Sequence, residues 1–208
     1  NDIFNSDGSS SGTANNADGS YSTYSNDGQG DIVSDYFDAA EVLQRYSVST
    51  DDGLGDITTT NYDPNGVKLS DTWTKADGSY GLDTFNSDGS YTSTVNDGLG
   101  DITTMTYDAN GNLISDSYTY SDGSYYNDTY NADGSSSGNY HNADGSYYTY
   151  TQDAQGNYAE QDFNASGVET YDYFWHPDNS WSEDYFNADG SSYGDSYNAD
   201  GSYSDYTN

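Results

Sequence analysis

The 208-residue sequence has no cysteine, only two prolines, and only three basic residues against 36 acidic ones. The lack of cysteine excludes disulfide bonds and thiol chemistry. The formal net charge of −33 would repel nucleic acid and anionic membranes, so we expect neither as a partner. No stretch approaches the roughly 18 consecutive apolar residues of a membrane span, and we therefore expect no membrane insertion. Cations are the natural counterpart of such a surface.

Aliphatic residues are scarce and scattered, and the apolar content is mostly tyrosine, with 25 copies. Tyrosine hydroxyls need water or a hydrogen-bond partner, which favours thin, partly wet sheets over a globule. High charge with low hydrophobicity is typical of disorder. However, 16% of the residues are aromatic, and they recur at fixed offsets from glycines. This periodicity favours an ordered chain.

One short unit recurs along the whole chain. It is marked by 18 turn positions, and of the 17 intervals between them 13 are eleven residues, three are twelve and one is fourteen. The turn positions are Gly8, Gly19, Gly30, Glu41, Gly55, Gly66, Gly78, Gly89, Gly100, Gly111, Gly123, Gly134, Gly145, Gly156, Gly167, Asn179, Gly190 and Gly201. A longer block, residues 52–96, is repeated from residue 97. We expect a single tandem-repeat array over residues 1–208, with about 18 strand-turn units.

The residues around each turn position predict a hairpin turn. Asn or Asp three residues earlier can cap the turn, and the glycine takes the left-handed conformation that closes a type I turn with a bulge. Asn179 replaces glycine because asparagine tolerates that conformation. The clearest predicted structural turns are those at Gly66, Gly89, Gly111, Gly134, Gly145, Asn179 and Gly190.

Between turns lie about seven residues rich in Ser, Thr and Tyr, a length and composition typical of one strand. Rings four residues before and two residues after the turns are expected to line up strand after strand. Successive hairpins predict an all-β fold, a long antiparallel meander that curls into a spiral or solenoid because strands twist. Both a spiral around a hollow interior and a two-strand-per-rung solenoid fit the pattern. The twelve-residue units predict β-bulges, and Asp38–Arg45, the only segment of helical composition, is predicted as turn and strand.

Two segments carry a resemblance to a known family. Residues 107–113 read Tyr-Asp-Ala-Asn-Gly-Asn-Leu, and residues 62–69 read Tyr-Asp-Pro-Asn-Gly-Val-Lys-Leu. They resemble the signature of YD-repeat proteins, which implies a spiralling shell that encloses a toxin or serves as a large surface protein. The commonest sequence among the other units is Asn-Ala-Asp-Gly-Ser, and the arginine common after the family's glycine is absent. The pairing of two eleven-residue units is also similar to curli-like secreted fibre subunits.

Three two-glycine turns are candidate calcium sites. Each places two carboxylates beside turn carbonyls, and oxygen atoms are the ligands that calcium prefers. The candidate ligands are Asp27, Asp31, Asp52, Asp56, Asp97 and Asp101. The alternative is a hairpin turn in which the aspartates cap backbone amides.

The densest aromatic cluster, residues 171–181, is a candidate carbohydrate contact through Tyr173, Trp175 and Trp181. The alternative is cross-strand Trp packing beside a turn.

Catalysis is not expected, because the sequence shows no nucleophile–base pair or metal triad. Acidity, richness in Ser, Thr, Asn and Gly, and tandem repetition together favour an extracellular protein. We expect a secreted or cell-surface structural protein that self-associates into a filament, shell or stalk by β-sheet stacking, with no cofactor other than calcium. A calcium- or glycan-binding adhesin module and a YD-repeat shell segment are the alternatives.

Overall fold

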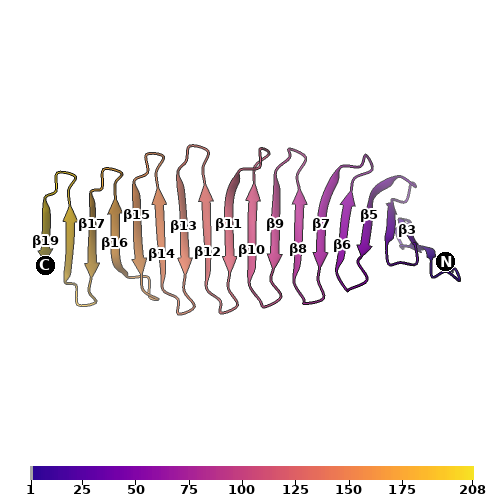
Figure 1. Cartoon of the computed structure of the whole chain (residues 1–208), viewed down its shortest axis with the longest axis horizontal. Coiled ribbons are helices and arrows are strands. Elements are labelled where there is room, and N and C mark those ends of the chain that lie inside the picture. Colours follow the sequence, from indigo (N-terminus) through magenta and orange to yellow (C-terminus); the bar gives the residue numbers. More distant parts are fainter. Residues whose placement is uncertain (1) are drawn as a thin grey trace. The chain divides into compact units, whose positions relative to one another are not determined.

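The computed structural model describes residues 2–208, which form nineteen β-strands and no helix. The all-β prediction is therefore confirmed. No helix among the described residues is long and apolar enough to cross a membrane. Contacts divide the chain into two compact units, Asn1–Gly111 and Asn112–Asn208. Each unit is a row of strands joined by short turns (Figure 1).

The first unit contains ten strands. They are β1 (Asp2–Phe4), β2 (Ser10–Asn15), β3 (Tyr21–Asn26), β4 (Ile32–Phe37), β5 (Leu43–Asp51), β6 (Ile57–Tyr62), β7 (Lys68–Thr74), β8 (Tyr80–Phe85), β9 (Tyr91–Asn96) and β10 (Ile102–Tyr107). The second unit contains nine. They are β11 (Leu113–Thr119), β12 (Tyr125–Tyr130), β13 (Ser136–His141), β14 (Tyr147–Gln152), β15 (Tyr158–Phe163), β16 (Glu169–Trp175), β17 (Trp181–Phe186), β18 (Ser192–Tyr197) and β19 (Tyr203–Thr207).

Within each unit, every strand pairs antiparallel with the strand before it and the strand after it. The predicted antiparallel meander is thus confirmed. Among the described residues of either unit, only strands adjacent in the chain have backbones that lie side by side. Each unit is consequently a single layer of sheet, and non-adjacent strands meet only through side chains that reach across the strand between them, as Asp128 and Tyr150 do.

The single layer leaves both faces open to solvent. No hydrophobic side chain among the described residues is buried, and the only buried polar side chains are the serines Ser47, Ser79 and Ser124. The usual dominant source of stability, removal of apolar area from water in a core, is therefore weak here. Backbone ladders, cross-strand side-chain pairs and the turns must supply most of the stability.

The turn at residues 142–146 illustrates the commonest connection. Asn142 N–H donates to the Ser146 carbonyl at 2.8 Å, and Gly145 N–H donates to the Asn142 carbonyl at 3.0 Å. The Asp144 Oδ1 accepts the Ser146 N–H at 2.9 Å and the Ser146 hydroxyl at 2.7 Å, while Asn142 Nδ2 donates to Ser146 Oγ at 2.9 Å. The sequence Asn-Ala-Asp-Gly-Ser therefore encodes a closed hydrogen-bond network, which explains why it recurs.

A second turn chemistry uses the Asx residue three positions before the turn position. Asp63 Oδ1 accepts the N–H groups of Asn65 and Val67 at 2.9 and 2.8 Å, and Asp153 does the same for Gln155 and Asn157. This is the cap expected from the sequence. All the clearest predicted turn positions have a positive φ: Gly66 (85°), Gly89 (90°), Gly111 (81°), Gly134 (88°), Gly145 (87°), Asn179 (69°) and Gly190 (86°).

The extra residue of a long unit is accommodated directly after its turn. In β7, Lys68 pairs with Tyr62 and Ser70 pairs with Asn61, which leaves Leu69 as a bulge. Thr170 in β16 and Gln44 in β5 are extra in the same way. A bulge keeps the rest of the strand on its proper face, since a one-residue shift would exchange the two faces.

The eleven-residue period is odd, and this places the rings beside successive turns on alternate faces. Trp175 pairs with Trp181 on one face, whereas Tyr147 pairs with Phe163 on the other. The rings beside the turns do line up across the strands, as predicted. However, a row on one face contains only the rings beside every second turn. The structural repeat is therefore about 22 residues, two strands with one turn at each edge.

Alternate turns share an edge of the sheet and pack on one another. A Cβ added to Gly28 would lie 2.8 Å from Ser9 N and 2.9 Å from Asp7 O, whereas one added to Gly53 would meet nothing within 4 Å. Each of these residues is the first glycine of a two-glycine turn, and their φ values are 85° and 76°. Gly28 therefore permits a backbone contact between turns that Gly53 does not make.

The three basic residues all lie in the first unit and cover aromatic rings. The Arg45 guanidinium lies 3.5 Å from the centre of the Tyr36 ring, and Lys75 Nζ lies 5.1 Å from that of Trp73. Lys68 lies over Phe85 at 4.8 Å and forms an ion pair with Asp71. Such contacts stabilise by about 0.5–1 kcal/mol at exposed sites.

We predict that Gly28→Ala destabilises the protein more than Gly53→Ala. Both variants place a Cβ in the left-handed region, at a cost of about 1–2 kcal/mol. Gly28→Ala must also displace the backbone of residues 7–9, which should add at least about 1 kcal/mol. Urea denaturation followed by circular dichroism measures both, and equal losses would contradict the turn-on-turn contact.

We also predict that Glu41→Gly stabilises the protein. Glu41 has a φ of 64°, which costs a residue with a Cβ about 1–2 kcal/mol relative to glycine. The gain in the free energy of unfolding should be about 1 kcal/mol, after the greater freedom of glycine in the unfolded chain is allowed for. Asn179→Gly is the matched control and should gain less, because asparagine tolerates this conformation. A loss of stability in Glu41→Gly would show that its side chain compensates for the strain.

Candidate functional site

Five of the six aspartates predicted to bind calcium accept hydrogen bonds from backbone N–H groups in or beside the turns. The first carboxylate of each pair caps its own turn: Asp27 Oδ1 accepts the N–H groups of Gln29 and Asp31 at 2.7 and 3.2 Å. Asp52 and Asp97 do the same in their turns. Among the described residues no group of three or more His, Cys, Asp or Glu side chains is placed to hold a metal ion. Calcium binding at these turns stays a prediction.

Two of the second carboxylates accept hydrogen bonds from outside their own turns. Asp31 Oδ1 accepts the N–H of Asp51 at 3.2 Å, and Asp56 Oδ1 accepts that of Ala76 at 3.1 Å. These bonds join a turn to the next turn along the same edge. The role shown for Asp31 and Asp56 is thus to tie neighbouring turns together.

One face of the second unit, here called the aromatic face, carries three rows of side chains that cross the strands. The register aligns the first row as Tyr130, Ser136, Gln152, Tyr158, Trp175, Trp181, Tyr197 and Tyr203. It aligns the second as Asp116, Asp128, Gly138, Tyr150, Glu160, Tyr173, Glu183, Asp195 and Asp205. The third is Tyr118, Tyr126, Tyr140, Tyr148, Asp162, Tyr171, Tyr185, Tyr193 and Thr207.

Tyrosine and carboxylate side chains interact throughout this face. Tyr171 donates to Glu183 Oε2 at 3.1 Å, Tyr203 donates to Asp195 Oδ1 at 2.6 Å, and Tyr158 donates to Glu160. Rings stack between strands, as for Tyr185 and Tyr193 at 4.8 Å. Burial first, and then the negative charge of Asp116, raise the pKa of Tyr130 to about 12. Tyr130 therefore remains a hydrogen-bond donor at neutral pH.

Three glycines within strands, Gly12, Gly138 and Gly194, make room for a Tyr–Asp pair. A Cβ on Gly138 would lie 1.8 Å from Asp128 Oδ1 and 2.6 Å from Tyr150 Cε1. Gly12 is covered by Asp2 and Tyr24, and Gly194 by Asp184 and Tyr206. In each case the Asp is ten residues before the glycine and the Tyr twelve after. The spacing of Asp, Gly and Tyr could have predicted these three contacts from the sequence. The predictions above concern only the glycines in turns and do not include it.

An open groove of about 390 Å³ lies on the aromatic face at β14–β16. It is lined by Gln152, Gly156, Tyr158, Tyr173 and Trp175, and is here called the aromatic groove. The Tyr158 and Tyr173 rings are 6.4 Å apart and inclined at 57°. Two of the three predicted carbohydrate contacts, Tyr173 and Trp175, thus line one groove. Trp181 pairs directly with Trp175 on the same face but does not line it.

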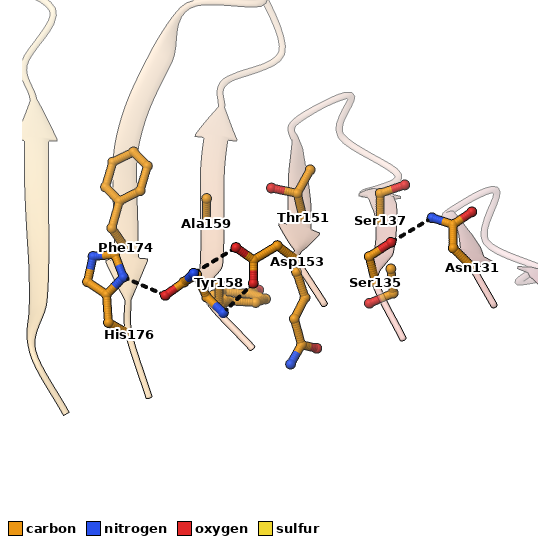
Figure 2. A pocket seen from close by; sticks show the side chains of 12 residues that line it. Asn131, Ser135, Ser137, Thr151, Asp153, Tyr158, Ala159, Phe174 and His176 are labelled. Carbon is orange, nitrogen blue, oxygen red and sulfur yellow. Dashed lines mark hydrogen bonds between the residues drawn. The ribbon is translucent and has the colours of Figure 1, made fainter. Parts of the chain in front are cut away.

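A second groove, of about 480 Å³, combines small and polar side chains (Figure 2). A row of Ser137, Thr151, Ala159 and Phe174 crosses four strands on the face opposite the aromatic face. At its end, Asn157 Oδ1 lies 2.8 Å from His176 Nδ1, and Asn157 Nδ2 donates to Asp153 Oδ2 at 2.6 Å. No predicted site residue lines this groove. The groove could not be predicted from the sequence, because its small residues come together only when the strands from β13 to β16 pair in their observed register.

Two sets of aspartates have pKa values that are shifted in opposite directions. Burial raises the pKa of Asp162, assisted by Glu160, and that of Asp172, assisted by Asp184. One buried oxygen of each has no hydrogen-bond partner within residues 2–208. The turn aspartates behave oppositely: the Ser146 hydroxyl and then its N–H lower the pKa of Asp144. Eight other turn aspartates paired with serine, from Asp7 to Asp200, behave the same way.

The chain matches no protein-family model, and no curated protein sequence is significantly similar to it. The likeness to YD-repeat proteins therefore rests on residues 62–69 and 107–113 and on the period of the repeat.

We predict a stability maximum in mildly acidic solution. Asp162 and Asp172 bind a proton more tightly in the folded state. Their destabilising effect is therefore fully present above their raised folded pKa, and it disappears as the pH falls through that pKa towards the unfolded value of about 3.9. The turn aspartates stabilise the fold fully above their unfolded pKa, and this contribution is lost as the pH falls through their lower folded values. The free energy of unfolding from urea titrations between pH 3 and 7 (about one measurement per half unit) checks this.

Two variants separate the opposing effects. Asp162→Asn should raise stability at pH 7 and flatten the gain on mild acidification, whereas Asp144→Ala should lower stability at pH 7 and flatten the loss at more acidic pH. A profile that falls steadily from pH 7 downward would contradict the assignment of Asp162 and Asp172.

Proposed function

We propose that this protein is a non-catalytic structural repeat array of a secreted or cell-surface protein. One observation carries the proposal: among the described residues the backbone of each strand lies beside those of its chain neighbours alone, and no hydrophobic side chain is buried. Such a sheet has no core that fixes its size. Strands can be added in pairs without changing the environment of the existing ones, as in other repeat proteins.

The surface chemistry supports an extracellular setting. The array is covered by Ser, Thr, Asn and carboxylates, carries a formal charge of −33, and contains no thiol that an oxidising environment could modify. High charge of one sign keeps exposed sheets soluble and discourages indiscriminate sheet stacking. Self-association, where it occurs, should therefore require cations or acid to reduce repulsion.

We predict that deletion of residues 136–157 leaves a folded protein. The deletion removes β13, β14 and two turns, and it brings Tyr158 to the position of Ser136 opposite Tyr130, so both faces keep their register. The dependence of unfolding free energy on urea should fall in proportion to the surface removed, while the far-ultraviolet strand signal per residue stays constant.

Deletion of residues 136–146 alone is the matched control. It removes one strand, and it would set Tyr147, which lies on the opposite face, against Tyr130 of the aromatic face. The rows of both faces would then be exchanged at the junction, so this shorter deletion should cost more stability than the longer one. If the longer deletion unfolds the chain, stability is not local and the array proposal fails.

A further inference from the structure

The aromatic groove has the features of a ligand site. It is concave, its volume of about 390 Å³ lies within the range of small-molecule sites, and its walls combine three rings with the amide of Gln152. The Tyr158 hydroxyl is held by Glu160. The groove thus presents preformed apolar surfaces beside polar groups.

The rings of the groove belong to a longer row. Tyr158, Trp175, Trp181, Tyr197 and Tyr203 follow one another in register on β15–β19. Adjacent strands are about 4.8 Å apart, so one ring recurs at each step of this spacing. Tyr197 and Tyr203 are 39% and 58% exposed. Tyr158, Trp175 and Trp181 are half-buried. A regular row of half-buried to exposed rings suits a ligand that is itself a regular chain of rings.

Carboxylates accompany this row on the same face. Glu160, Glu183, Asp195 and Asp205 occupy the adjacent row of the aromatic face. Residues 112–208 contain 17 acidic residues and no Lys or Arg. The carboxylates therefore have no lysine or arginine partner within their own unit, and an anionic ligand would be repelled.

These observations define the ligand's chemistry. Aromatic rings attract the C–H faces of sugar rings by dispersion and attract ammonium groups through their quadrupole. Ammonium groups also form charge-assisted hydrogen bonds with carboxylates. An extended polymer of amino sugars presents both features at every residue. A basic peptide carries the charge but lacks the regular succession of flat rings.

We propose that the aromatic groove and the adjoining row of rings and carboxylates bind a cationic amino-sugar polymer. The polymer lies across the strands, with sugar faces against the rings of Tyr173, Trp175 and Trp181 and ammonium groups beside Glu160 and Glu183. This binding function is separate from the structural role of the array and does not depend on it.

Isothermal titration calorimetry of the full chain tests the proposal with three probes: a β-linked glucosamine hexamer, its N-acetylated counterpart, and hexalysine. At about pH 5.5 the amines are protonated and the exposed carboxyls are ionised. The glucosamine hexamer should bind at least about tenfold more tightly than the neutral N-acetylated hexamer, because the latter lacks the charge. Hexalysine should bind weakly, with an affinity that salt abolishes.

Variants of adjacent residues on opposite faces provide the control. Trp175→Ala should weaken glucosamine-hexamer binding by about tenfold, whereas Phe174→Ala, on the opposite face and 39% exposed, should change it by less than about twofold. Glu183→Gln keeps the shape of the side chain and should reduce the preference for the cationic hexamer. Circular dichroism confirms that each variant is folded.

Three results would overturn the proposal. These are no binding of the glucosamine hexamer, equal losses in Trp175→Ala and Phe174→Ala, and hexalysine binding that matches the sugar and depends equally on Trp175. The last would assign the surface to basic peptides instead. If Trp175→Ala fails to fold, Glu183→Gln with the two hexamers still decides the charge dependence.

Discussion

A positive φ at the closing position of each turn is the constraint on which the rest of this structure depends. The left-handed residue reverses the chain within a few positions and sets the two flanking strands in register, so each hairpin is specified locally. Where glycine is replaced, by Glu41 or Asn179, the chain still adopts φ values of 64° and 69°. Neighbouring turn networks hold even an unfavourable residue in this conformation. Because no core exists to correct a wrong register, the turns must specify it.

The absence of a core also changes the role of the aromatic residues. In a globular protein such rings would fill an interior, but here they form rows that cross the strands on both open faces. Stacked neighbours such as Tyr91 and Tyr107, with centroids 4.5 Å apart, shield one another instead of being covered by a second layer. The same rows therefore stabilise the sheet and form the surface that we propose binds an amino-sugar polymer.

The sequence predicts the local structure of this chain well because the information is local. The Asx and glycine positions around Gly145 or Gly66 predict turn, strand and bulge without any knowledge of distant residues. The face that each ring occupies also follows from the sequence, because the period of eleven residues is odd. Equivalent rings of successive units, such as Tyr147 and Tyr158, therefore lie on opposite faces. The Tyr–Asp pair over Gly138 and the small-residue groove near Phe174 depend on alignment across three or four strands. The division into two units after Gly111 has no marker in the repeat itself.

The location of the three basic residues affects how long such an array would survive outside a cell. Proteases of the trypsin type cut only after Lys or Arg, and the last basic residue of this chain is Lys75. Residues 76–208 thus contain no bond that these enzymes recognise. The three bonds that they could recognise follow Arg45, Lys68 and Lys75, whose side chains lie over aromatic rings. An exposed single-layer sheet, which has little mechanical protection against digestion, is in this way shielded by its composition from one large class of extracellular enzymes.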